Sequence, residues 1–383
     1  MKIEFFTKNI PRMNNILVIG GGMVGSAICY DLLKTDRVTL WDIKPADDSV
    51  LLKDSNFSFQ ANDLFDAEAK DFHDFDLLVL AVPGFMGIRA LEHILVSGKP
   101  IVDISFFPED AFLLSEYAKE CGSTVIVDCG VAPGFSNIVL GHHAARSKVL
   151  DFKCYVGGLP LKPEAPFFYK APFSPIDVIE EYTRPARIRR EGKDIELAAL
   201  SELEQMDFGQ YGVLEAFNTD GLRSLLKVFP DIPNMTEKTL RYPGHTQLIA
   251  GIRDAGFFRE EEIQLRGKMV SPIELSSKLL IEQWTLDPKE AEFTLMRIEV
   301  TNEESVHNYL LYDERDEETG IASMSRTTGY TCTAAVQWLL NKKDQETGIF
   351  PPEMIAKQDD FMKHVIDHLR ERNISIEVSS KLL

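Results

Sequence analysis

The chain has 383 residues, of which 44% are hydrophobic, 26% charged and 10% aromatic. This composition is typical of a folded protein and excludes the disordered, fibrous and low-complexity classes, and the length favours two domains. The formal net charge of −19, from 41 Lys and Arg against 60 Asp and Glu, repels nucleic-acid phosphates and anionic lipid headgroups. We therefore expect neither a nucleic-acid partner nor a membrane partner.

The cysteines and the N-terminal segment indicate a reducing compartment. The five cysteines are odd in number, widely spaced and free of any CxxC pair, which argues against a disulfide framework and a structural zinc site. No apolar run approaches the ~20 residues that span a bilayer, and residues 1–15 are too polar and too short for a signal peptide. We expect a cytoplasmic protein without a metal site.

A glycine-rich turn follows the first expected strand, the apolar run 16–19. The turn reads Gly20-Gly21-Gly22-Met23-Val24-Gly25, a G-x-G-x-x-G pattern. Its first glycine permits a tight turn, its second lets a pyrophosphate approach the backbone, and its third lets a helix pack on the strand. That helix, expected over 24–33, directs its free N–H groups and positive dipole end at the phosphates.

A carboxylate stands where dinucleotide-binding units place one on the ribose. A second strand, 37–41, ends in Asp42, 22 residues after Gly20. Asp42 is expected to accept hydrogen bonds from the ribose hydroxyls and to repel a 2′-phosphate, so NAD is favoured over NADP. The nearby Lys44 weakens this preference. The alternative interpretation is a structural turn followed by a chance acid.

Strands and helices alternate through the first third of the chain. We expect strands at 76–82, 100–105 and 124–128, with helices at 86–96 and 109–120 between them. This alternation predicts an α/β fold of the Rossmann type, a doubly wound parallel sheet that binds ligands at the carboxyl ends of its strands. For Asp103 a helix cap or loop carboxylate is the alternative. The expected cofactor contacts are Gly20, Gly22, Met23, Val24, Gly25, Asp42, Ala81, Val82, Pro83, Asp103 and Ser105.

The pattern changes after residue 134. A helix at 136–146 leads into segments of alternating apolar residues, such as 152–156 and 292–300, which are typical of antiparallel strands with one exposed face. We interpret residues 129–324 as a second, α+β domain, followed by helices at 331–340 and 363–371. The acidic run 313–318 lacks the glycine and spaced oxygens of a calcium loop and is expected to be a solvated turn. The sequence has no G-x-S-x-G, H-E-x-x-H or P-loop lysine motif, which removes the support for a hydrolase or a kinase.

Six ordered segments resemble the saccharopine dehydrogenase family: 20–25, 128–137, 157–160, 219–223, 239–245 and 323–330. The resemblance covers nearly the whole chain from Met13 and is closest to the lysine 6-dehydrogenase branch. It implies an oxidoreductase that uses a nicotinamide cofactor on a carbon–nitrogen bond of lysine or a lysine adduct, and hence a role in lysine degradation. Saccharopine reductases carry an acid before the Pro-Gly of the second segment, where this chain has Ala132.

The resemblance also implies an architecture. The chain end, residues 325–383, is expected to fold back and complete the NAD-binding domain of residues 13–128. Residues 129–324 are then the substrate-binding and dimerisation domain of a homodimer.

Amine oxidation requires a base, because a lysine ε-amine with a pKa of about 10.4 is protonated at neutral pH. His245, Asp128 and Lys170 are the candidate catalytic residues; their structural alternatives are a surface histidine, a turn-capping carboxylate and an exposed lysine. Arg241 suits the carboxylate of an amino-acid substrate, which a guanidinium binds through two parallel hydrogen bonds. The family resemblance implies the same role, and a salt bridge is the alternative. Tyr169 is the second expected substrate contact.

Two classes of function are compatible with these observations. The first is an NAD-dependent amino-acid dehydrogenase that oxidises the ε C–N bond of L-lysine, with a saccharopine dehydrogenase or reductase as its alternative within the family. The second is a non-catalytic NAD-binding regulator, since a fold does not fix a function.

Overall fold

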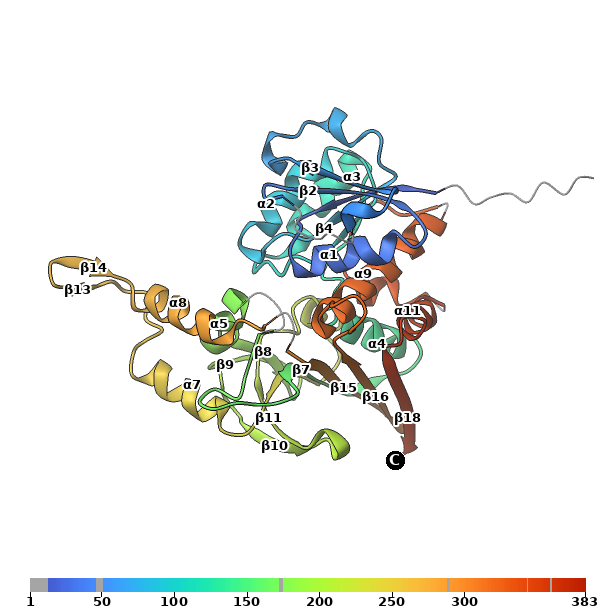
Figure 1. The fold of residues 1–383 in the computed structure, drawn as a ribbon. Helices are drawn as coiled ribbons and strands as arrows, with labels where there is room; N and C mark the ends of the chain where they lie inside the picture. The colour runs from blue at the N-terminus through green and yellow to red at the C-terminus, as the bar shows by residue number, and fades with distance from the viewer. Residues whose placement is uncertain (1–12, 46–50, 172–174, 288–289, 343, 359) are drawn as a thin grey trace, which may run out of the picture.

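The computed structural model describes residues 13–45, 51–171, 175–287, 290–342, 344–358 and 360–383. The expectation that the chain has no signal peptide concerns residues 1–15, and residues 1–12 lie outside the described residues. Two large sheets lie one above the other in Figure 1, joined by helices between them. No helix in the described ranges is both long enough and apolar enough to cross a membrane.

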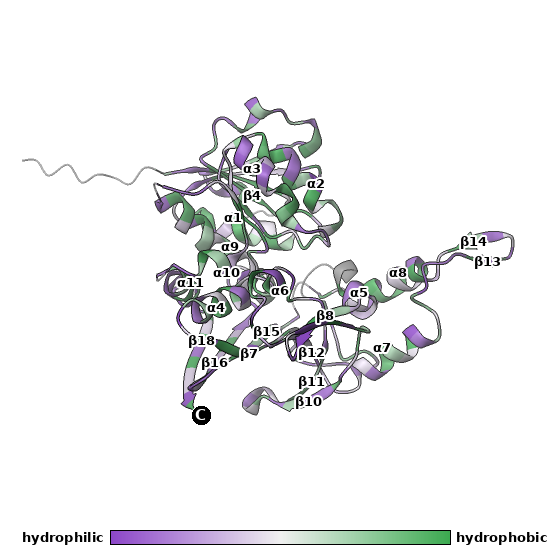
Figure 2. Cartoon of the chain, turned by 180° about the vertical axis from the view of Figure 1, so that it is seen from behind, coloured by the Kyte–Doolittle hydropathy of each residue, from purple (hydrophilic) through white to green (hydrophobic). Residues whose placement is uncertain are grey.

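Seven parallel strands form the first sheet, in the order β17-β6-β5-β4-β1-β2-β3. Its inner strands are apolar because both faces are covered; β4, with four buried apolar residues, is among the most hydrophobic segments in Figure 2. The order 3-2-1-4-5-6 is that of a doubly wound nucleotide-binding sheet, which confirms the expected Rossmann-type fold. The strands are β1 (Asn15–Ile19), β2 (Arg37–Asp42), β3 (Phe57–Ala61), β4 (Leu77–Leu80), β5 (Ile101–Asp103), β6 (Thr124–Ile126) and β17 (Gly348–Phe350).

Helices cover this sheet close to their expected positions. The expected helix at 109–120 is divided into a 3-10 turn and α3. Strand β3 was not predicted from the sequence, because it is a half-exposed edge strand without a clear apolar run. The helices are α1 (Met23–Leu32), α2 (Gly84–Leu95) and α3 (Ser115–Cys121), and the 3-10 turns are η1 (Leu51–Lys53), η2 (Leu64–Asp66), η3 (Ala69–Phe72) and η4 (Ala111–Leu114).

The second sheet is mixed, with the path β10-β11-β12-β7-β15-β16-β18 and with β8 and β9 attached to β12. The two expected strands lie within β7 and β15, which pair antiparallel, whereas β7 and β12 run parallel. The strands are β7 (Val149–Pro160), β8 (Ala186–Arg190), β9 (Lys193–Leu197), β10 (Glu204–Asp207), β11 (Val213–Asn218), β12 (Asn234–Arg241), β15 (Glu292–Asn302), β16 (Ser305–Glu314) and β18 (Ser375–Leu382).

Shorter elements complete the second half. The hairpin of β13 and β14 projects from the body beyond α8 in Figure 1. The acidic run was expected to be solvated throughout, but Asp313 belongs to β16 and is buried in an ion pair with Arg326. The remaining elements are α4 (Phe135–Ala144), α5 (Pro175–Thr183), α6 (Leu225–Val228), α7 (His245–Asp254), α8 (Pro272–Trp284), α10 (Pro352–Ile355), α11 (Phe361–Arg370), η5 (Gly209–Tyr211), β13 (Ile263–Leu265) and β14 (Lys268–Val270).

Helix α9 (Ser323–Asn341) connects the second sheet to the first. It begins eight residues before the expected start at Thr331, although its first turns are rich in Ser, Thr and Gly. Most of its residues are buried, so tertiary packing overrides their low helix propensity. A Cβ at Gly329 would stand 3.2 Å from Ile28 Cγ1, so the glycine allows α9 to pack closely on α1. One core runs through both halves, from Val18 of β1 to Met296 of β15.

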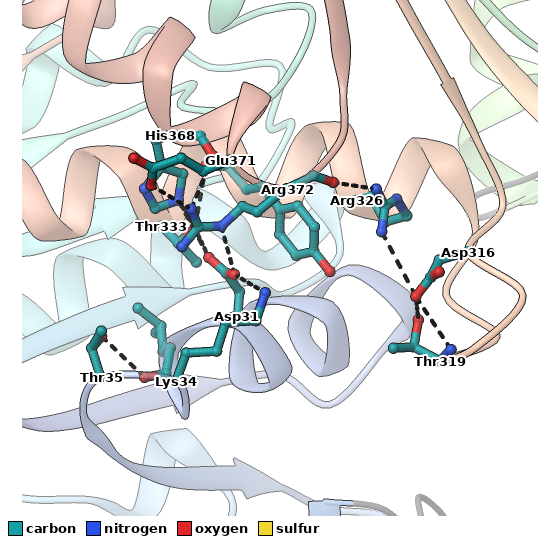
Figure 3. A network of polar contacts seen from close by, with 12 residues as sticks. Asp31, Lys34, Thr35, Asp316, Thr319, Arg326, Thr333, His368, Glu371 and Arg372 are labelled. Carbon is teal, nitrogen blue, oxygen red and sulfur yellow. Dashed lines mark hydrogen bonds and ion pairs between the residues drawn. The ribbon is translucent and has the colours of Figure 1, made fainter.

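The chain after residue 325 is shared between the two sheets. Strand β17 pairs with β6 in the first sheet, whereas β18 pairs with β16 in the second. A buried polar network joins α1 to the C-terminal helices (Figure 3). In it, Asp31 accepts hydrogen bonds from Thr333 Oγ1 and Arg372 Nε, each at 2.6 Å, and lies 3.3 Å from His368 Nε2. The chain end is therefore anchored to the first half by charge as well as by packing.

Candidate functional site

The glycine turn after β1 has the geometry that a dinucleotide pyrophosphate requires. Gly20 has φ +105°, and a Cβ there would lie 2.3 Å from Ala81 O. A Cβ at Gly25 would lie 1.9 Å from Gly20 O, so this glycine allows α1 to pack on the turn. At Gly22 a Cβ would meet nothing within 4 Å, so the space beside this residue is open. Gly22 is the N-cap residue of α1, and no side chain of this residue caps the N–H groups of the first turn. The residues present therefore fit a phosphate group at this helix N-terminus.

Asp42 ends β2 and lies against the same turn. Its Oδ2 accepts a hydrogen bond from Gly21 N at 2.6 Å, and its Oδ1 accepts one from Lys44 N at 2.8 Å. Each carboxylate oxygen has a second lone pair, so Asp42 retains the capacity to accept ribose hydroxyls. Asp42 therefore lies at the glycine turn, where the spacing to Gly20 predicts it, and its contact with a ribose stays a prediction.

A cavity of about 980 Å³ extends from this turn to the second sheet. Its size lies at the upper end of the roughly 300–1,000 Å³ of small-molecule sites. One side is formed by the carboxyl ends of the first sheet and the other by β7, α5, β12 and the loop after β11. The expected cofactor contacts that line it are Gly20, Gly22, Met23, Val24, Gly25, Asp42, Ala81, Val82 and Pro83.

Asp103 and Ser105, which were also expected to contact the cofactor, lie behind the cavity wall. Both are almost fully buried, and Asp103 Oδ1 accepts a hydrogen bond from Ser105 N at 3.0 Å. Side chains alternate along an extended chain, so their neighbours Ile104 and Phe106 line the cavity instead. Burial, with a smaller effect of Asp128, raises the pKa of Asp103 to about 8.

Strand β12 contributes three polar residues to the far end of the cavity: Glu237, Thr239 and Arg241. They follow the period of two that places alternate side chains on one face of a strand. Arg241 is 1% exposed, and its Nη2 lies 2.5 Å from Glu181 Oε2 on α5. The expected substrate ligand therefore reaches the cavity, but it is also held by the protein.

A chain of hydrogen bonds fixes the other side of Arg241. Arg241 Nε donates to Tyr182 Oη at 3.1 Å, Tyr182 Oη donates to His245 Nε2 at 2.8 Å, and His245 Nδ1 donates to Phe167 O at 2.7 Å. The carbonyl of Phe167 can only accept, which fixes this direction. The ring of Tyr169 lies 4.2 Å from the guanidinium carbon. Tyr169 thus supports Arg241 from behind and does not line the cavity.

His245 does not reach the cavity. Its side chain is fully buried, and burial, together with the charge of Arg241, lowers its pKa to about 3. A histidine in this environment is neutral at physiological pH, and its two nitrogens already have partners. The position is that of a residue that orients Tyr182 and Arg241, not of a base exposed to substrate.

The other two candidate bases differ from each other. Lys170 is half-buried outside the cavity wall, where its Nζ donates to Gln283 O at 2.8 Å. Asp128 lines the cavity and accepts a hydrogen bond at Oδ2 from Arg223 Nε at 2.9 Å, with both side chains buried. Of the three candidate bases, only Asp128 therefore lines the cavity.

Several charged residues at this end of the cavity were not anticipated from the sequence. The sequence could have predicted Glu237, because it precedes Arg241 by four residues and therefore lies on the same face of the strand. The others depend on how α5 and the loop after β11 pack, for which the sequence has no local signal. The additional charged residues are Glu180, Glu181, Arg184, Asp220 and Glu237.

The fold and the cavity define a two-domain protein of the dinucleotide-binding, dehydrogenase type. The family model for the saccharopine dehydrogenase C-terminal domain matches residues 130–374, well over half of the chain. The chain therefore belongs to the saccharopine dehydrogenase family, and the resemblance found in its motifs is confirmed at this level.

Individual relatives agree with this assignment. The chain is 27% identical over 199 residues to an alpha-aminoadipic semialdehyde synthase of Arabidopsis thaliana, covering 48% of this chain and 19% of that protein. It is 27% identical over 202 residues to a saccharopine dehydrogenase [NADP(+), L-glutamate-forming] of Pyricularia oryzae, covering 49% and 44%. The chain thus matches less than half the length of these curated relatives.

A solved structure supports the fold over the full length. The apo saccharopine dehydrogenase (L-Glu forming) of Saccharomyces cerevisiae superposes with a TM-score of 0.77 over 96% of this chain and all of that one, at 17% identity. At this identity the likeness shows a shared fold and no more.

Proposed function

We propose that the protein is an NAD-dependent amino-acid dehydrogenase that oxidises the ε C–N bond of L-lysine. The observation that carries the proposal is the single cavity in which the glycine turn and Asp42 face a charged pocket on the second sheet. A nicotinamide cofactor, when bound along the glycine turn, supplies the hydride acceptor. The chain itself contributes orientation, charge and the exclusion of water.

The charges of the pocket favour a cationic substrate. Five carboxylates line this end of the cavity, and four of them each have an arginine partner. The fifth, Glu237, has none among the described residues, so it is the acid there that a substrate cation can pair with. Lysine carries a net charge of +1 at neutral pH and saccharopine a net negative charge, so a carboxyl group without an arginine partner favours lysine. The four pairs are Asp128–Arg223, Glu180–Arg184, Glu181–Arg241 and Asp220–Arg187.

Arg241 is the proposed ligand of the substrate carboxylate. It is fixed by Glu181 and Tyr182 and still borders the cavity, which is the preorganisation that a carboxylate clamp needs. Asp128 lies on the same wall and is suited to steer an ammonium group toward the reacting position.

A second candidate function is the oxidation of saccharopine, because the names of two relatives specify saccharopine and NADP(+). Asp42 favours NAD over NADP in this chain, since a carboxylate at the ribose repels a 2′-phosphate.

The domain boundaries at 129 and 324, the homodimer and the cytoplasmic location also remain proposals.

A panel assay tests the proposed function. The protein is incubated with NAD or NADP and with lysine, saccharopine, ornithine or a simple diamine, and the absorbance of the reduced nicotinamide is followed. We expect turnover with lysine and NAD. A preference for saccharopine supports the second candidate, and no turnover with any substrate supports a non-catalytic nucleotide-binding protein.

A further inference from the structure

Among the described residues, Glu237 is the carboxylate at the second-sheet end of the cavity that has no arginine partner. It lies in the middle of β12, is 4% exposed and lines the pocket between Arg241 and the loop after β11. Its Oε2 has no hydrogen-bond partner within the described part of the chain. A buried carboxylate without a partner is costly, so its presence beside an open pocket indicates that a ligand supplies the missing partner.

The neighbouring loop is shaped around this carboxylate. A Cβ on Gly221 would stand 1.5 Å from Glu237 Oε1, so any larger residue at this position would displace the carboxylate from where it lies. The glycine has an ordinary negative φ, so backbone freedom does not explain it, whereas the close approach does.

We propose that Glu237 is the general base of the lysine oxidation, the group that takes the proton from the substrate ε-ammonium. This assignment rests on the proposed function and names the base that it requires. Of the residues expected from the sequence, His245 and Lys170 lie outside the cavity, and Asp128 is paired with Arg223. Asp128 Oδ1 also has no hydrogen-bond partner in the described residues, but the charge of Asp128 is balanced by Arg223, whereas Glu237 has no arginine partner there. Glu237 is therefore the acid that a substrate ammonium can pair with.

The step balances as follows for a lysine side chain. The carboxylate of Glu237 removes one proton from the ε-ammonium and leaves a lone pair on nitrogen. This lone pair forms a C=N bond as the C–H bond of Cε breaks and its electron pair leaves as hydride to the oxidised nicotinamide. Water adds to the resulting iminium carbon, its protons pass to nitrogen as the C–N bond breaks, and an aldehyde and an ammonium ion are released. Glu237 returns its proton to solvent.

The charges around Glu237 suit this transfer. Asp220, Glu181 and Asp128 face it from the surrounding loops and α5, Arg223 opposes them, and Cys154 is its register partner on β7. Burial, followed by the acids, raises its pKa to about 8. The difference between the pKa of Glu237 and the pKa of about 10.4 of a lysine ammonium thus falls from about 6 units to about 2. Proton transfer from the ammonium to Glu237 is therefore less unfavourable.

The variant Glu237→Gln tests the assignment, since it keeps the shape and removes the base. We expect kcat for lysine to fall about 10²- to 10⁴-fold, with NAD affinity within about twofold of the unaltered protein. The unaltered enzyme should gain kcat/KM as the pH rises toward about 8, and the variant should lose this rise. Glu353→Gln is the matched control: Glu353 is also buried, with a pKa raised to about 7 and an unpartnered Oε1, but lies outside the cavity wall.

A second measurement does not depend on turnover. The infrared band of a neutral carboxylic acid is compared with and without lysine near pH 7, in the unaltered protein and in Glu237→Gln. We expect lysine to remove a band that the variant lacks, because the ammonium ionises Glu237.

The outcomes separate the two proposals. If lysine is oxidised but Glu237→Gln keeps kcat within about threefold together with the pH profile, the assignment is overturned and the proposed function stands. If no amine is oxidised and lysine leaves the infrared band unchanged, both are overturned. An infrared change without turnover retains Glu237 as the ammonium ligand but overturns its role as the base.

Discussion

The Cα of Gly221 lies so close to Glu237 that a Cβ would stand 1.5 Å from Oε1. Gly221→Ala therefore has to displace the carboxylate. We expect kcat for the amine to fall about 100-fold, because a displacement of ~1 Å in a catalytic group costs about that much. Steady-state kinetics with saturating NAD check this. Gly251→Ala on α7, where a Cβ meets nothing within 4 Å, should retain the activity of the unaltered protein.

Asp42 should determine the choice of cofactor. A carboxylate that meets a 2′-phosphate and loses its ribose hydrogen bonds costs several kcal/mol, so NAD should bind more than about a hundredfold tighter than NADP. Asp42→Ser should reduce this ratio sharply. Dissociation constants from fluorescence titration decide the matter, and equal constants for the two cofactors in the unaltered protein would place Asp42 away from the ribose.

Arg241 should affect stability and catalysis together. From the sequence, an open-cleft ligand is expected to contribute little to the empty fold, but the side chain is buried and paired with Glu181. Arg241→Ala should lower the free energy of unfolding by about 3–5 kcal/mol, the cost of breaking a buried pair. Arg241→Lys keeps the charge and should be less destabilised.

Kinetics of the milder variant separate the two roles of Arg241. If the guanidinium holds the substrate carboxylate, Arg241→Lys should still lose about 30-fold or more in kcat/KM per folded molecule. A normal KM for the amino acid in Arg241→Lys would remove Arg241 from the list of substrate ligands. Urea unfolding and steady-state kinetics on the same preparations provide both readouts.

Asp31 should make the attachment of the chain end sensitive to acid. Burial alone raises the pKa of Asp31, but the hydrogen bond from His368 and the charge of Arg372 outweigh it and hold the pKa well below its usual value (Figure 3). An acid with a depressed pKa stabilises the fold above its unfolded pKa of about 3.9 and loses this effect as the pH falls further.

Two variants test this account of Asp31. Asp31→Asn should cost about 3–5 kcal/mol at pH 7, and the difference from the unaltered protein should shrink toward pH 3. Urea unfolding at both pH values measures it, and an unchanged difference would contradict the account. Lys34→Ala removes only a half-exposed partner of Asp31 and should cost less than about 1 kcal/mol.

The sequence placed Gly20, Gly25 and Asp42 along one cavity because they belong to one turn and the strands beside it, and their spacing is a local feature. Their contacts with a cofactor stay a prediction. The sequence predicted that Asp103 and Ser105 line the cavity, but Ile104 and Phe106 line it instead. The sequence at the end of a strand does not show which side chains face the cavity.

The substrate half was harder to predict because its residues meet through tertiary packing. His245 lies in a motif that suggests chemistry, but only the fold shows that Tyr182 and Phe167 occupy both of its nitrogens. Glu181 reaches Arg241 from a helix 60 residues earlier in the chain. The early start of α9 has the same cause, since burial overrides the low helix propensity of its Ser, Thr and Gly residues.

The fate of the ε-nitrogen shows whether the protein oxidises lysine at its ε C–N bond. Lysine labelled with ¹⁵N at the ε-amine is incubated with the protein and NAD, and labelled ammonia and reduced nicotinamide are quantified together. If the protein oxidises the ε C–N bond of lysine, one labelled ammonia is released for each NADH formed. Retention of the label in an organic product, or the absence of NADH, would contradict this proposed function.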